Sequence, residues 1–153
     1  MKSVSKYFIP ILLGCMCFST FAETTKEDFE QFLEQEVSLS ALKIVGYKAG
    51  DMWAIMLQAH RGEISLSKTE AEVLLAKLIG LHMCFQKIHE KHPYEPDVES
   101  AYFLTLDDSI LFRQAGNSLA KIIGDDDSGA LKLVPDIVCS QYLSPEELKI
   151  YHI

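Results

Sequence analysis

The chain has 153 residues and a formal net charge of −8 at pH 7, with 22 acidic residues against 14 lysines and arginines. Such a charge repels phosphate backbones, so it excludes a nucleic-acid-binding protein and argues against docking on an anionic lipid surface. The length is enough for one domain with a substantial core and short for two.

Residues 1–22 have the form of a secretory signal peptide, with two lysines before an apolar run over 7–18. That run is shorter than the about 20 residues that a helical membrane span requires. Thr20 and Ala22 occupy the −3 and −1 positions of a cut after Ala22, so we expect a single mature domain over 23–153. This domain would carry 12 basic and 22 acidic side chains, a net charge of −10.

A lipoprotein box at residues 12–15 overlaps this signal and would place a lipid on Cys15. Cleavage before Cys15 would shorten the apolar run and leave an apolar stub over 16–18. We therefore expect the soluble mature chain, with lipidation at Cys15 as the alternative. Both cuts predict an exported chain, either periplasmic or secreted in the first case and membrane-anchored in the second.

Two cysteines, Cys84 and Cys139, remain after the signal peptide leaves with the other two. An even pair in an oxidising compartment predicts a disulfide bond. Closing the loop between them would stabilise the fold by about 4 kcal/mol in the chain-entropy model.

A short helix is predicted over residues 25–37, capped by Thr24 or Thr25 and with one narrow apolar stripe. The stripe consists of Phe29, Phe32, Leu33 and Val37. The rest of this helix is strongly acidic, and its carboxylates could attract a cationic protein. The candidate docking residues on this face are Glu27, Glu30 and Glu34.

Two longer segments carry apolar or small residues in alternating steps of three and four, which indicates packed helices. The first stripe is Leu42, Val45, Ala49, Met52, Met56 and Ala59, and the second is Ala71, Leu74, Leu78, Leu81, Phe85 and Ile88. Ser67 and Glu70 predict a capping box before the second helix, which His92-Pro93 should end.

A second face of the first long helix carries Gly46, Gly50, Trp53 and Leu57. The two glycines are one turn apart and would let a neighbouring helix approach closely. Charged residues in the same turns exclude the membrane version of this glycine pattern. We therefore predict that this helix is covered on two sides and forms the centre of a bundle.

The remaining chain also favours helices. Residues 92–97 are predicted to form a linker, 98–123 a helix with Asp107-Asp108 as a candidate break, and 130–142 a helix that Pro135 breaks or kinks. Gly124 should end a helix, Asp127 or Ser128 should cap the next, and Ser144-Pro145 should start a last short one. The predicted fold is all-α, a compact single-domain bundle of about five to six helices.

No pattern in the sequence assembles an active site. The spacing of His82, His89 and His92 does not match a zinc-protease helix, and 124–129 lacks the acids of an EF-hand loop. Ser118 lacks the glycines and the preceding strand of a nucleophile elbow. We therefore predict no catalytic residues, no metal, no cofactor and no enzymatic activity.

An exported acidic helical domain of this kind is most simply a protein-binding domain with a basic partner. We expect an inhibitor or immunity protein that neutralises a secreted cell-wall hydrolase or similar toxin; a homo-oligomer is compatible with these features. The alternative is a pilotin-like or other envelope-machine accessory lipoprotein anchored at Cys15. The second candidate docking face is the acidic turn formed by Asp125, Asp126 and Asp127.

Overall fold

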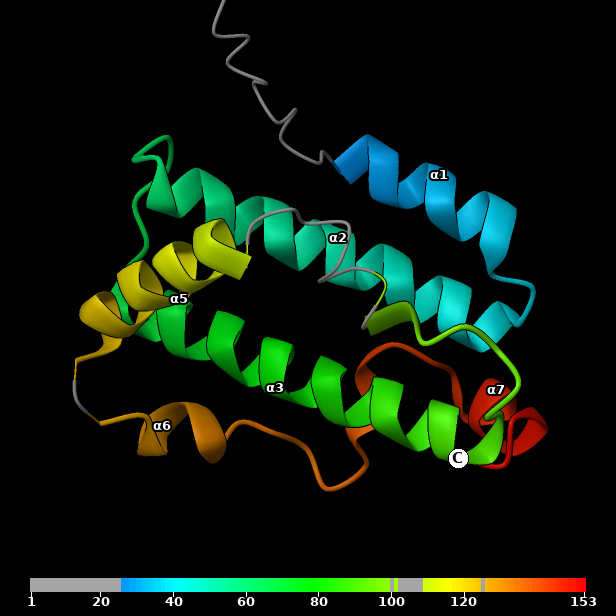
Figure 1. Ribbon diagram of the computed structural model, residues 1–153. Helices are drawn as coiled ribbons and strands as arrows, with labels where there is room; N and C mark the ends of the chain where they lie inside the picture. The colour runs from blue at the N-terminus through cyan, green and yellow to red at the C-terminus, as the bar shows by residue number, and fades with distance from the viewer. Residues whose placement is uncertain (1–25, 100, 102–108, 125) are drawn as a thin grey trace, which may run out of the picture.

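The computed structural model describes residues 26–99, 101, 109–124 and 126–153. The predicted signal peptide, Cys15, Asp107, Asp108 and Asp125 lie outside these residues. Within them the chain forms helices and no strand, which confirms the all-α prediction (Figure 1). The helices are α1 (Lys26–Glu36), α2 (Ser40–His60), α3 (Lys68–Lys91), α5 (Ser109–Ile123), α6 (Ser128–Leu131), a 3-10 helix η1 (Val138–Gln141) and α7 (Pro145–Ile150). Residues 98, 99 and 101 are also helical.

Helix α2 is the centre of the bundle, as its two apolar faces predict. It contacts α1 on one side and α3 and α5 on the other, and α6, η1 and α7 follow on the far side of α3 or at its end (Figure 1). Both predicted stripes face the core, with two exceptions: Ala59 and Leu78 are only partly buried. From α1, Phe29 and Leu33 are buried against α2, and Val37 is buried directly after the end of α1.

The contact between α1 and α2 depends on small residues in α2. A Cβ atom added to Gly46 would lie 2.6 Å from Leu33 Cδ2, closer than any packed carbon pair can approach. A Cβ atom on Gly50 would meet Phe29 Cδ1 at 3.6 Å, an ordinary van der Waals distance. The predicted close approach is therefore confirmed, and Gly46 is the position that requires glycine.

Three predicted helix boundaries are confirmed by their local hydrogen bonds. Ser67 and Glu70 form the capping box that starts α3, and Ser144 and Glu147 form an equivalent one at α7, with Pro145 in its first turn. Helix α5 ends before Gly124, whose φ of +88° favours glycine.

The predicted disulfide is also confirmed, because Cys84 in α3 is bonded to Cys139 in η1, 55 residues away. Both cysteines are buried, so the bond holds the C-terminal segment against α3. Close to it, the Tyr142 hydroxyl donates a hydrogen bond to the Lys77 carbonyl oxygen at 2.7 Å. Burial raises the pKa of Tyr142 to about 12.

The segment over 130–142 is not one continuous helix, and of the two predicted effects of Pro135, a break or a kink, the structure shows the break. Helix α6 ends at Leu131, the chain then runs irregularly through Pro135, and only the short η1 follows. Pro135 has no N–H to donate and disfavours helical geometry at Val134, so the helix cannot continue through this point. The non-helical path brings Cys139 to Cys84.

The two glycines of α2 provide a matched test of the packing. Gly46→Ala should lower the free energy of unfolding by about 1–3 kcal/mol, because the new methyl group overpacks the buried Leu33. At Gly50 the added methyl group has room, so Gly50→Ala should raise the free energy of unfolding by about 0.5–1 kcal/mol through helix propensity. Urea unfolding followed by circular dichroism measures both, and equal effects would contradict the close α1–α2 contact at Gly46.

Candidate functional site

The acidic face of α1 is partly neutralised within the molecule. Glu34 accepts hydrogen bonds from Lys43 Nζ at 2.7 Å and from the Tyr47 hydroxyl, both on α2. Lys26 pairs with Asp51 on α2 and lies 3.5 Å from Glu30. Two of the three predicted docking carboxylates are therefore held by lysines of the same molecule.

These contacts shift the ionisation of the groups involved. The hydrogen bond from Lys43, followed by that from Tyr47, lowers the pKa of Glu34 below its ordinary range. The hydrogen bond to Asp51 is the main cause of a raised pKa at Lys26. The ion pairs thus hold α1 on α2 while leaving Glu27 and Glu36 exposed at the surface of α1.

The second predicted face, the acidic turn before α6, lies on the other side of the molecule from α1 (Figure 1). Asp126 Oδ1 accepts a hydrogen bond from the Ser128 backbone N–H at 2.9 Å, and contacts with Ser128 lower the pKa of Asp126. The predicted capping role of Asp127 or Ser128 therefore belongs to Asp126, because Asp127 makes no side-chain cap. The two candidate docking faces are separate and do not form one surface.

The histidines are dispersed rather than gathered. His82 Nδ1 contacts the Glu99 carboxylate, His92 Nε2 lies 3.4 Å from the Tyr151 carbonyl oxygen, and His89 Nδ1 is buried without a hydrogen-bond partner. No group of three or more histidine, cysteine or acidic side chains within the described ranges is placed to hold a metal ion.

One serine–histidine contact brings together residues that the sequence leaves far apart. His60 Nδ1, at the end of α2, lies 2.8 Å from Ser118 Oγ in α5. The same hydroxyl is 3.0 Å from the Gln114 carbonyl oxygen, to which it donates as serines inside helices commonly do. With its proton used in this way, the hydroxyl accepts from the imidazole. The contact ties α2 to α5 and does not activate a nucleophile.

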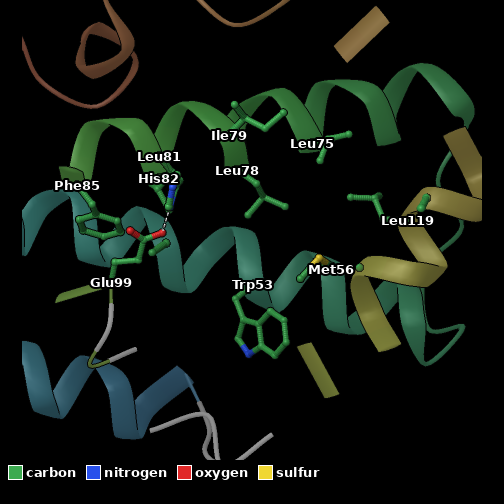
Figure 2. Close-up of a pocket in the computed structure, with 13 residues that line it drawn as sticks. Trp53, Met56, Leu75, Leu78, Ile79, Leu81, His82, Phe85, Glu99 and Leu119 are labelled. Atoms are coloured by element: carbon green, nitrogen blue, oxygen red, sulfur yellow. Dashed lines mark hydrogen bonds and ion pairs between the residues drawn. The ribbon is translucent and has the colours of Figure 1, made fainter. Parts of the chain in front are cut away.

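A pocket between α2, α3 and α5 is the main feature that sequence reasoning missed. It has a volume of about 640 Å³, and most of the described residues that line it are apolar, among them Trp53 and Met56 of α2, Leu75 and Leu78 of α3, and Leu119 of α5 (Figure 2). Leu78, placed by its spacing in the middle of the core, instead lines this pocket. This position at the pocket explains why the side chain of Leu78 is only partly buried.

A shallower groove of about 400 Å³ lies between α2 and α3 and includes residues close to the α1 ion pairs. Ile55 and Val73 line it and are exposed to 40 % and 38 %. Charged side chains at its edges include Asp51, the partner of Lys26 on α1. Exposed aliphatic side chains with a charged rim are typical of a surface that binds another protein.

The function of this protein has to be inferred from its own structure. No protein-family model, curated protein or solved structure matches this chain. None of the helices in the described part of the chain is long and apolar enough to cross a membrane. The Cys84–Cys139 bond is compatible with an oxidising, extracytoplasmic compartment.

The Glu34 ion pair predicts a specific pH dependence of stability. Because its pKa is lowered in the folded state, Glu34 stabilises the fold above its ordinary value of 4.5, and this contribution is lost as pH falls through the lowered value. The stability difference between the wild type and Glu34→Gln should therefore be largest near neutral pH and shrink in acid. Urea unfolding from about pH 7 to about pH 3 measures it, with Glu27→Gln as the control for loss of one exposed charge. A difference that does not change with pH would contradict the role of the ion pair.

Proposed function

We propose that this chain is an exported protein-binding domain, an inhibitor or immunity protein that neutralises a secreted basic hydrolase such as a cell-wall enzyme. The observation that carries the proposal is the location of the charge. No charged residue in the described part of the chain is buried, so its acidic excess is at the surface, where it attracts a cationic partner from a distance.

The α1 side of the molecule offers the more complete docking surface. Lysines pair with Glu30 and Glu34, and Glu27 and Glu36 are exposed on the same helix. Through Asp51 this acidic helix is connected to the α2–α3 groove with its exposed Ile55 and Val73. A basic enzyme could pair its cations with the acids and place an apolar side chain in the groove, which is how apolar contacts and rim charges combine at protein interfaces.

The turn before α6 is the competing surface. Asp126 and Asp127 are exposed there, and Leu131, Leu133 and Ile137 form an exposed aliphatic group in the following segment. Lys68 and Lys132 lie close enough to Asp126 to lower its pKa, so this turn is also partly neutralised. Variants that change one surface at a time distinguish the two.

Charge reversal on α1 should slow association with the partner. The test immobilises the mature chain, captures a basic hydrolase from the cell envelope, and measures binding kinetics with the purified enzyme. Glu27→Lys with Glu36→Lys avoids the internal ion pairs and should reduce the association rate by about tenfold or more without lowering the melting temperature. Raising salt from about 50 to about 500 mM should remove most of that difference, because salt screens exposed charges.

Two further pairs act as matched controls. Asp126→Asn with Asp127→Asn tests the α6 turn. Glu63→Lys with Glu90→Lys makes the same charge change as the α1 pair, at exposed positions outside both faces. If the α6 pair alone weakens binding, docking occurs at that turn. If all three pairs of substitutions leave the binding kinetics unchanged, the inhibitor proposal is wrong and the accessory-lipoprotein alternative is favoured. The same conclusion follows if only a lipidated form binds and its partner is a secretion subunit.

A further inference from the structure

The pocket between α2, α3 and α5 has the size and composition of a small-molecule site. Its volume of about 640 Å³ falls within the roughly 300–1,000 Å³ range that ligand pockets occupy. It lies on the inner side of α2, and the acidic α1 contacts the other side of that helix, so the pocket is separate from the proposed protein-docking surface.

Among the described residues that line the pocket, the ionisable side chains lie at one end. Figure 2 shows His82 and Glu99 in contact beside Phe85, whereas Leu75 and Leu119 lie toward the opposite end. The apolar stretch between these ends includes Leu78 and Met56. A ligand that matches this arrangement is elongated, with one polar head and an apolar tail.

The His82–Glu99 pair also indicates which head it would accept. An ionised carboxylate only accepts hydrogen bonds, so His82 Nδ1 carries the proton that it shares with Glu99. In the neutral imidazole this leaves Nε2 as an acceptor, and Glu99 retains further acceptor capacity. The pair therefore offers acceptors and a negative charge, which favour a cationic head that donates hydrogen bonds over an anionic one.

From this geometry we propose that the pocket binds a single-chain amphiphile with an amine head, its tail among the side chains of α2, α3 and α5 and its head at His82 and Glu99. The site goes beyond the proposed inhibitor function and does not depend on it. A fatty-acid anion would place its carboxylate against Glu99 and should bind less tightly.

Trp53 is the single tryptophan of the chain and lines the pocket, so its fluorescence reports occupancy directly. The purified mature protein is titrated with dodecylamine, dodecan-1-ol and dodecanoate, each below its micelle concentration. Binding should be saturable, and the affinity should decrease in the order amine, alcohol, carboxylate, with at least a tenfold difference in affinity between the amine and the carboxylate. Shortening the amine from 12 to 8 carbons should weaken binding by about fourfold per methylene, as expected for a buried tail.

Two variants test the proposed positions of the head and the tail of the ligand in the pocket. Glu99→Gln keeps the shape and removes the charge, so it should reduce the preference for amine over carboxylate at least tenfold and leave the alcohol unchanged. Gly116→Leu should block all three ligands, because a Cβ at this pocket-lining position meets no atom of the described residues within 4 Å and the side chain can enter the pocket. Asn117→Leu adds the same side chain at the neighbouring exposed position of α5 and should bind as the wild type does.

Circular dichroism of each variant establishes that it is folded before ligand is added. Absence of saturable fluorescence change with all three amphiphiles in the wild type would overturn the proposal. Equal loss of binding in Gly116→Leu and Asn117→Leu would place the ligand elsewhere. Dodecanoate binding as tightly as dodecylamine would contradict the role given to Glu99.

Discussion

The close contact of α1 with α2 at Gly46 is the constraint on which the rest of the structure depends. Because glycine at this position lets Leu33 pack directly against the α2 backbone, α1 packs closely on one side of α2. The opposite face of α2 is then left for α3 and α5. A helix that is buried on both sides organises the bundle, and each neighbour takes its position from α2.

Unequal helix lengths explain why a pocket forms on the inner side of this arrangement. Helices α2 and α3 have 21 and 24 residues, and α5, which packs on both, has 15. Helix α5 therefore packs along only part of the length of the other two. The apolar side chains that remain between them, Leu78 among these, line the pocket. The same stripe of residues thus builds the core and the cavity.

Periodicity and capping chemistry predicted most of the fold because both are local properties of the sequence. The α3 stripe and its Ser67–Glu70 capping box could be recognised without knowing any neighbour. The Cys84–Cys139 bond was predicted from the signal-like N-terminus and from the even number of cysteines that remain after it. Over 130–142 the sequence left a break and a kink at Pro135 open, and the structure shows the break; the irregular path to Cys139 could not be predicted because it depends on the distant Cys84.

The candidate sites were less predictable because they depend on pairs of residues from different helices. The acids of α1 were evident, but their partners Lys43 and Tyr47 on α2 could be identified only once the two helices were placed together. The pocket depends on where α5 crosses α3, and no local pattern encodes that crossing. His82 and Glu99 likewise become a pair only in the folded chain.

The central claim, that this exported acidic domain neutralises a basic hydrolase, is tested most directly by the catalytic rate of the captured enzyme. The rate of substrate hydrolysis is measured while the purified mature chain is added in increasing molar ratio. Inhibition should rise linearly and be complete near one equivalent, since a tight inhibitor blocks one active site per molecule. An unchanged rate at saturating binding would show that the chain binds the enzyme without inhibiting it, and would contradict the proposed function.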